Sequence, residues 1–393
     1  MRKLLCLTVL SLASLAPAFA QRELPPIAVG FDARSIRVHV SANTPALNSL
    51  AYQAFRSHGR YNPVASDYKY DFKFSLIAPH QVRVDILKGS ETLASQVAVG
   101  TSDRNALLRA ADIAVEKTNG LGLKGYFASK LTFLIEAGSH KEVCVGDLFF
   151  GDVIQVTHDN AIAMTPRWTP DGNRIVYTSF YQTGFPDIFM IDLASNQRST
   201  FESFKGTNSG ARFSPDGRHV AMVLTGSGNT EIWVADASGH GLQRRTRSDL
   251  VKSSPAWSPD GSQLIFASEP GPQLYTMSAY GGSPHRVTHD ISSYCAEPDW
   301  SRAAPTKVAF TMRLGRAYQI AVLDLSTGQS KQVSQAPFDG IEPCWLPDGR
   351  HLVFTARNAS RSGIFILDTE TGRGTPVSPS SLPSVLEANV LAR

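Results

Sequence analysis

Three glutamates stand at a regular spacing in the second half of the chain. Glu297, Glu342 and Glu387 are 45 residues apart, and each precedes the same position of an internal repeat by three residues. Because equivalent residues of a repeat occupy equivalent places in the fold, the three carboxylates should lie in neighbouring units. Carboxylate oxygens can accept hydrogen bonds from loop amides, bind a hard cation such as Ca2+, or face a basic group of a partner. The residues alone leave open which of these roles this acidic arc (Glu297, Glu342 and Glu387) has.

The other residues that could do chemistry favour structure over catalysis. His285 and His289 have the spacing of one strand face, but His289 occupies the repeat position of His158 at a strand end. No Gly-x-Ser-x-Gly and no His-Glu-x-x-His motif occurs, so serine-hydrolase and zinc-peptidase chemistry have no support. A polysaccharide lyase built from such repeats would need a histidine-rich metal cluster, and the ten histidines do not collect at equivalent positions. The sequence thus predicts no catalytic residue and, Ca2+ apart, no cofactor, which leaves a lyase as the weakest alternative.

The repeat itself is an aromatic residue followed by a Pro-Asp-Gly turn. Proline presets φ, aspartate bonds its own turn and glycine accepts a positive φ, so the chain reverses into the next strand. The aromatic positions recur every 43–45 residues, at Trp168, Phe213, Trp257, Trp300 and Trp345. A period of about 40–45 residues made of short strands indicates the four-stranded blades of a β-propeller. The turn acids are therefore expected to be structural: Asp171, Asp216, Asp260 and Asp348. The copy at Trp300 lacks Pro-Asp-Gly, which predicts an irregular turn there.

The two ends of the repeat region complement each other. Strands expected at Thr132–Ile135, Glu142–Val145 and Val153–Thr157 match the second, third and fourth strands of a blade, but no innermost strand precedes them. Glu387–Val390 repeats Glu342–Trp345 at a spacing of 45 residues and supplies that strand. Pairing the last strand with the first closes the ring and removes exposed sheet edges. The sequence predicts six blades closed by the C-terminal strand.

A small α+β domain is expected over residues 21–125, before a propeller over residues 126–393. Thr44 followed by Pro45, and Ser102, are helix start signals. The expected order is β-α-β-β-β-α, with strands at Ile36–Val40, Tyr70–Leu76, Gln81–Leu87 and Thr92–Val99 and helices from Thr44 to Gly59 and from Ser102 to Gly120. No glycine-rich phosphate loop occurs in this part. The predicted fold class is multidomain, an α+β domain followed by an all-β six-bladed propeller.

Residues 1–20 have the features of a cleavable secretory signal. Arg2 and Lys3 precede an apolar run, Leu4–Ala16, and Ala18-Phe19-Ala20 forms a small-x-small cleavage site. The run is shorter than the roughly 20 residues that span a membrane, and no second run follows, so no membrane insertion is expected after cleavage. Three cysteines then remain, an odd number, and they are expected to be buried apolar fillers: Cys144, Cys295 and Cys344.

The charge balance argues against nucleic acid as a partner. Without Arg2 and Lys3 the chain carries 36 basic and 34 acidic residues, and it has no run of lysines or arginines. A protein that neutralises many phosphates needs such a basic surface. A protein partner is therefore the better expectation.

Exposed aromatic residues are expected on one rim of the propeller. The Pro-Asp-Gly turns join first and second strands and line one rim, whereas the loops into the innermost strands share the opposite rim with the loops between second and third strands. Aromatic side chains are what interface hot spots prefer. The expected partner-binding residues combine this aromatic rim with the acidic arc: Phe180, Tyr181, Phe185, Tyr294, Tyr318, Glu297, Glu342 and Glu387.

The chain resembles the TolB family of the Tol-Pal envelope system. The resemblance rests on the Pro-Asp-Gly repeats, on the small domain before six blades, and on the segment from Gly122 to Phe133 that leads into the first propeller strand. It implies a non-enzymatic, monomeric adaptor of the periplasm that supports outer-membrane integrity and cell division. Its expected partner is the peptidoglycan-associated lipoprotein Pal. An exported propeller of unknown ligand is the alternative.

The resemblance also implies contact with the inner-membrane protein TolA. The family's TolA-contacting segment is short, alternating and located at the mature N-terminus. The nearest match here, Ile36–Val40, begins fifteen residues after Gln21 and is preceded by Pro25-Pro26.

Overall fold

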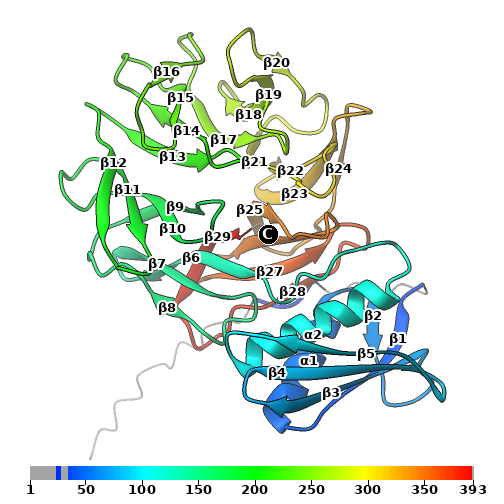
Figure 1. Ribbon diagram of the computed structural model, residues 1–393. Helices are drawn as coiled ribbons and strands as arrows, with labels where there is room; N and C mark the ends of the chain where they lie inside the picture. Colours follow the sequence, from blue (N-terminus) through cyan, green and yellow to red (C-terminus); the bar gives the residue numbers. More distant parts are fainter. Residues whose placement is uncertain (1–23, 28–33, 392–393) are drawn as a thin grey trace, which may run out of the picture.

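The fold is an α+β layer followed by a ring of six four-stranded sheets (Figure 1). A computed structural model describes residues 24–27 and 34–391. The proposed signal, residues 1–20, lies outside this part. The predicted multidomain fold class, with a six-bladed propeller, is confirmed.

The N-terminal sheet has the strand order β2-β1-β3-β4-β5. Its elements are β1 (Ile36–Ala42), α1 (Pro45–Ser57), β2 (Tyr61–Pro63), β3 (Tyr70–Ala78), β4 (Gln81–Lys88), β5 (Glu91–Val99) and α2 (Asp103–Thr118). The expected caps are present, because Thr44 Oγ1 accepts the Leu47 N–H at 3.3 Å and Ser102 Oγ accepts the Asn105 N–H at 3.1 Å. β2 was not expected, since it is only three residues long and ends in proline, a residue tolerated only at a sheet edge.

Six blades surround a central channel, each with its strands in chain order from the channel outward except the last. Blade one is β9 (Ala163–Trp168), β10 (Arg174–Ser179), β11 (Asp187–Asp192) and β12 (Arg198–Glu202); blade two is β13 (Asn208–Phe213), β14 (His219–Leu224), β15 (Glu231–Asp236) and β16 (Gln243–Arg244). Blade three is β17 (Lys252–Trp257), β18 (Gln263–Ser268), β19 (Gln273–Ser278) and β20 (His285–Arg286); blade four is β21 (Cys295–Trp300), β22 (Lys307–Leu314), β23 (Ala317–Asp324) and β24 (Gln329–Gln332). Blade five is β25 (Asp339–Trp345), β26 (His351–Arg357), β27 (Ser362–Asp368) and β28 (Gly374–Pro376).

Blade six joins the two ends of the propeller, as the sequence predicts. It has the order β29 (Ser384–Val390), β6 (Lys130–Ala137), β7 (His140–Asp147) and β8 (Ile154–Gln155). β29 pairs antiparallel with β6, from Ser384 opposite Glu136 to Val390 opposite Leu131. The C-terminal strand is therefore the innermost strand of the blade that the first propeller strand begins.

The Pro-Asp-Gly turns have the expected chemistry. Asp216 Oδ1 accepts the Arg218 N–H at 3.1 Å, and Gly217 has a φ of 73°. Blade four departs from this pattern, as predicted: Trp300 Nε1 donates to the Pro305 carbonyl at 2.8 Å. Trp300 pairs with Val308, whereas Trp257 of blade three pairs with Leu264, so the turn of blade four is one residue longer.

The N-terminal domain packs on the Pro-Asp-Gly rim, against blades five and six. Arg104 of α2 forms an ion pair with Asp147 at 2.7 Å. At the end of α1, Gly59 has a φ of 72°, and a Cβ there would lie 2.4 Å from an Asp368 carboxylate oxygen. Only glycine therefore fits this close approach. The segment from Leu24 to Ile27, assigned by the sequence to the N-terminal domain, packs instead in the core of blade five.

A buried histidine joins the two domains. His351 Nδ1 lies 2.6 Å from an Asp348 carboxylate oxygen, and its Nε2 lies 2.6 Å from the His58 carbonyl oxygen. Both partners only accept hydrogen bonds, so both ring nitrogens must donate, and His351 is an imidazolium. Burial alone would lower its pKa, but the carboxylates of Asp348 and Asp368 outweigh burial, and the pKa of His351 is raised above 6.5. This cation also faces the C-terminal end of α1, where the helix dipole favours positive charge.

His58 has the opposite protonation state. Its ring is fully buried among aromatic rings, with Tyr126 stacked at 5.2 Å and Phe127 edge-on at 5.7 Å, and neither ring nitrogen has a hydrogen-bond partner in the described residues. Burial, reinforced by the neighbouring His351, lowers the pKa of His58 to about 3. The domain interface thus pairs one charged and one neutral histidine.

The ring closure predicts a large effect of truncation. Removing the residues after Leu382 deletes β29 and leaves β6 with an unpaired edge on the channel. We expect the thermal midpoint to fall sharply and the protein to associate, measured by calorimetry and by light scattering. A truncated chain that stays monomeric with an unchanged midpoint would show that β29 does not close the ring.

The neutral state of His58 predicts a pH-dependent gain from its replacement. In the unfolded chain His58 binds a proton below about pH 6.5, whereas in the folded chain it does so only near pH 3, so wild-type stability is lost as the pH falls through this window. His58→Phe should remove that loss. The free energy of unfolding of the variant, relative to that of wild type, should therefore be about 2 kcal/mol higher at pH 5 than at pH 7. Urea unfolding at both pH values measures it.

The matched control for this experiment is His285→Phe, at an exposed position of β20. Its difference from wild type should be the same at pH 5 and pH 7. A pH-independent difference for His58→Phe as well would contradict the assignment of a neutral His58.

Candidate functional site

Every innermost strand carries a bulge at the repeat position of the acidic arc. The pairing with the second strand shifts register there in all six blades. The residue at the shift has a positive φ, between 48° and 64°, in each blade: Thr165, Gly210, Ser254, Glu297, Glu342 and Glu387. The bulge leaves a backbone N–H unpaired on the channel side, because the innermost strand is a sheet edge.

The acidic arc satisfies these N–H groups from one blade to the next. Glu297 accepts the Glu342 N–H at 3.0 Å, Glu342 accepts the Glu387 N–H at 3.2 Å, and Glu387 accepts the Thr165 N–H. Each carboxylate therefore accepts a hydrogen bond from a backbone amide of the neighbouring blade, as in one of the roles that the sequence left open, but this amide lies in a strand bulge and not in a loop. The threonines Thr311 and Thr355 add hydroxyl donors to Glu297 and Glu342, at 2.6 and 2.8 Å.

The three carboxylates repel one another. Burial first, and then Glu387 and Glu297, raise the pKa of Glu342 well above its ordinary value, and burial raises that of Glu387. The three side chains line a cavity of about 300 Å³ at one end of the channel, so water reaches them. The middle glutamate of the arc therefore holds its proton more tightly than an ordinary glutamate does.

The structure does not test the Ca2+ hypothesis for the acidic arc. Within residues 24–27 and 34–391, only His58, Asp348 and His351 form a group of three ligand side chains whose donor atoms all lie within 4.8 Å of one another. The three glutamates form no such group, since each is aimed at the next blade's amide. A Ca2+ ion at Glu297, Glu342 and Glu387 stays a prediction.

The predicted aromatic residues form two groups on opposite sides of the ring. Phe180, Tyr181 and Phe185 lie at the loop between β10 and β11 in blade one, where Tyr181 is 42% and Phe185 67% exposed. Arg198 lies over the Tyr181 ring, 4.0 Å from its centroid. Tyr294 and Tyr318 are half-buried in blade four, with ring centroids 5.3 Å apart. Blades one and four face each other across the channel in Figure 1, so no single cluster unites all five residues.

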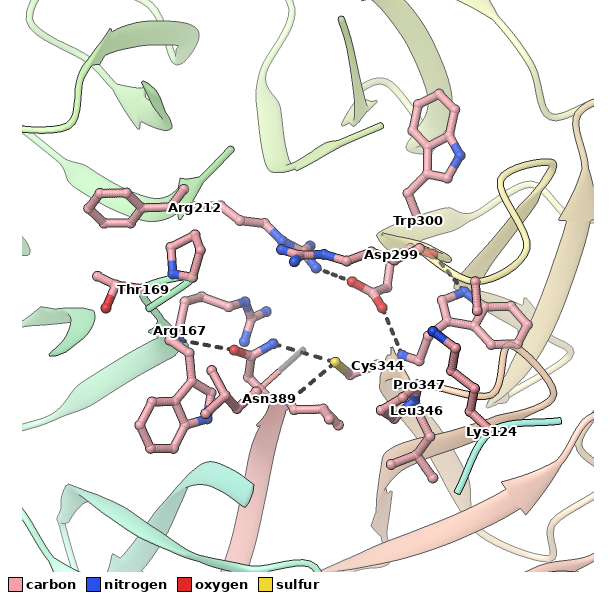
Figure 2. A pocket seen from close by; sticks show the side chains of 18 residues that line it. Lys124, Arg167, Thr169, Arg212, Asp299, Trp300, Cys344, Leu346, Pro347 and Asn389 are labelled. Carbon is pink, nitrogen blue, oxygen red and sulfur yellow. Dashed lines mark hydrogen bonds and ion pairs between the residues drawn. The ribbon is translucent and has the colours of Figure 1, made fainter. Parts of the chain in front are cut away.

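The sequence missed a second set of channel residues, one position before each repeat aromatic. Asp299 accepts the Trp345 N–H at 2.8 Å, Asn389 accepts the Trp168 N–H at 3.1 Å, and Cys344 Sγ lies 3.5 Å from the Val390 nitrogen. Figure 2 shows these side chains together with Arg167 and Arg212 around a cavity. The repeat alignment contained the signal, because this position reads Arg167, Arg212, Ala256, Asp299, Cys344 and Asn389.

Of the remaining candidates from the sequence, only Cys344 lies at the channel. His285 and His289 are exposed on blade three and belong to no group of metal ligands in the described residues. Cys144, Cys295 and Cys344 are buried free thiols, as expected. In the part of the chain that the structure describes, no helix is long and apolar enough to cross a membrane.

Comparison with known proteins identifies the family. Residues 118–381 match the family described as the TolB beta propeller domain. The chain belongs to the TolB β-propeller family. Over 175 residues it is 30% identical to the Tol-Pal system protein TolB of Bordetella pertussis, an alignment that covers 44% of this chain and 39% of that relative. The chain thus aligns with less than half the length of this TolB.

Solved structures agree on the fold. TolB from Acinetobacter baumannii superposes with a TM-score of 0.81 at 23% identity, covering 94% of this chain and 99% of that chain. A putative TolB from Agrobacterium tumefaciens gives a TM-score of 0.51 at 18% identity, covering 64% of this chain and 88% of that chain. The predicted resemblance to TolB is confirmed.

Replacing the middle glutamate of the arc tests its protonation. Glu342 is ionised in the unfolded chain above about pH 4.5, whereas its pKa in the folded chain is well above that value, so its contribution to stability is complete below pH 4.5 and is lost as the pH rises through its folded pKa. Glu342→Gln retains an acceptor for the Glu387 N–H without this loss. We expect equal stability at pH 4 and a gain on the order of 1 kcal/mol at pH 7, measured by urea unfolding.

Calcium titration of the same two proteins addresses the metal hypothesis. A Ca2+-dependent rise in the wild-type midpoint that Glu342→Gln abolishes would support an ion at the arc. Glu91→Gln, an exposed position of β5, serves as the control for non-specific charge effects. A wild-type thermal midpoint that does not change with Ca2+ would contradict the hypothesis of a Ca2+ ion at the acidic arc.

Proposed function

We propose that this protein is a periplasmic, non-enzymatic adaptor of the Tol-Pal envelope system. It binds a Pal-like lipoprotein and thereby supports outer-membrane integrity and cell division. The proposal rests on membership of the TolB β-propeller family and on relatives named Tol-Pal system protein TolB. A monomeric state and export by the signal at residues 1–20 belong to the same proposal.

The position of the N-terminal domain supports the opposite rim of the propeller as the binding face. That domain occupies part of the Pro-Asp-Gly rim, through contacts such as Arg104 with Asp147 and His58 with His351. The opposite rim bears the exposed rings of Tyr181 and Phe185 and opens onto the acidic arc. Exposed aromatic side chains on the same rim as the acidic arc are suited to a partner that presents apolar side chains together with a basic group.

Contact with TolA through the nearest matching segment is disfavoured by the pairing of β1. Ile36–Val40 lies in β1, which pairs with β2 on one side and β3 on the other. A central strand offers no free edge for strand addition by a partner. If TolA contact is retained, it uses residues other than this strand.

Two alternatives remain. An exported propeller with a different protein ligand would use the same rim, and only the identity of the captured partner distinguishes it. A polysaccharide lyase is disfavoured because no cluster of channel histidines occurs among the described residues.

Substitutions on the two rims test the proposal. Tyr181→Ala and Tyr294→Ala should each weaken binding of a purified Pal periplasmic domain at least fivefold in calorimetric titration, since hot-spot aromatics cost about 1–2 kcal/mol or more when truncated. Asp216→Ala, in a turn of the Pro-Asp-Gly rim, is the matched control and should leave the affinity unchanged.

Circular dichroism verifies that all three variants are folded. Equal losses from both rims would refute the assignment of the face. No measurable binding by wild type would instead favour a propeller with another ligand.

A further inference from the structure

The end of the channel at the Pro-Asp-Gly rim, the rim on which the N-terminal domain packs, has more cationic than anionic side chains. A cavity of about 300 Å³ there is lined by Lys124, Arg167, Arg212 and Arg302, and Asp299 is its only carboxylate among the residues that the structure describes. It is distinct from the cavity at the acidic arc, although Arg167, Arg212 and Asp299 line both cavities. We call this cavity the basic chamber.

The single carboxylate of the chamber is already used. Asp299 forms an ion pair with Arg212 through one oxygen and accepts the Trp345 N–H at 2.8 Å through the other. Arg212 also donates to the Pro298 carbonyl at 3.4 Å. This pair therefore has little capacity to neutralise a further cation.

Arg167 and Arg302 have no ion-pair partner among the described residues. Arg167 donates only to the carbonyl of its own neighbour, Pro166, at 3.0 Å, although a guanidinium carries five N–H donors. Burial first, and then the charge of Arg212, lower the pKa of Arg167. Arg302 lies on the exposed turn of blade four, at the edge of the cavity. Figure 2 shows the side chains of Arg167 and Arg212 reaching into the same cavity.

The irregular turn of blade four contributes to this arrangement. In the repeat, Arg302 stands two residues after the aromatic, where blades one, two, three and five have a proline: Pro170, Pro215, Pro259 and Pro347. Pro170 and Pro347 line the same chamber, so the substitution places a guanidinium where the neighbouring turns present an apolar ring. Lys124 comes from the segment between the two domains. Four separate parts of the chain thus bring cations to one cavity: the segment before β6 and blades one, two and four.

We propose that the basic chamber binds an oxyanion, a phosphate or carboxylate group. Guanidinium groups present pairs of N–H donors that match such groups, and an anion relieves the repulsion between neighbouring cations. A cavity of about 300 Å³, against roughly 30 Å³ for each water molecule, admits a group of this size with its hydration. The proposal does not depend on the partner of the opposite rim.

Calorimetric titration of the mature chain with inorganic phosphate tests the proposal. At constant ionic strength set with sodium chloride, wild type should bind phosphate with one site. Arg302→Gln, at the turn position where blades one, two, three and five have proline, should bind at least tenfold more weakly, and Arg167→Gln likewise. Arg218→Gln, whose side chain is 82% exposed on the turn of blade two, is the matched control and should bind as wild type does.

Acetate titrations in parallel distinguish a carboxylate from a phosphate ligand. Binding of either anion that Arg302→Gln weakens and Arg218→Gln does not supports the chamber. Absence of binding up to 10 mM of both anions, or equal weakening by Arg218→Gln, overturns the proposal. A tungstate soak locates the anion independently, and anomalous density found only outside the chamber overturns it as well.

Discussion

The unpaired inner edge of each blade is the constraint on which the propeller depends. Six innermost strands end at a channel, and each bulge aims a backbone N–H into it. A buried N–H without an acceptor costs about 1–3 kcal/mol, so an acceptor supplied by the neighbouring blade stabilises the ring. Two sets of side chains supply acceptors. The glutamates of blades four, five and six bond the bulge N–H groups. Asp299, Cys344 and Asn389 bond N–H groups at the repeat aromatic position of the next blade. The same side chains that close the ring therefore set the charge of the channel.

The acceptor chain is not continuous around the ring. Thr178 of blade one still accepts the Gly210 N–H at 3.3 Å, but blades two and three have Val223 and Ala267 where blades one, four and five have threonine. In the described residues, no corresponding side-chain bond links blade two to three or three to four. The side-chain acceptors for the bulge N–H groups are concentrated on the half of the ring where the two chain ends pair and where the N-terminal domain docks. That is the half in which an unsatisfied edge would open the closing blade.

The sequence predicted the features that repeat and missed those that depend on contacts between repeats. A fixed period, Pro-Asp-Gly turns and the match of Glu387–Val390 to Glu342–Trp345 were enough for six blades and their closure. The acidic arc was found because three equivalent positions share a residue type. Arg167 and Arg212 were missed because their position varies from blade to blade, and only the ring geometry reveals that it faces the channel. β2 and the docking of Leu24 and Ile27 on blade five leave no periodic pattern at all.

The cavities at the two ends of the channel differ in their balance of charged side chains, and they share several of these side chains. Carboxylates line the mouth beside the exposed aromatics, while arginines line the chamber below the N-terminal domain. Arg167 lines both cavities, and Glu387 acts on its pKa by raising it while burial lowers it. A cation arriving at the acidic mouth would favour the ionised form of Glu342, and an anion in the basic chamber would neutralise part of the positive charge near Arg167. The two cavities share Arg167, Arg212 and Asp299. A change of charge in one cavity therefore acts electrostatically on the ionisable groups of the other through these side chains, without any movement of the blades.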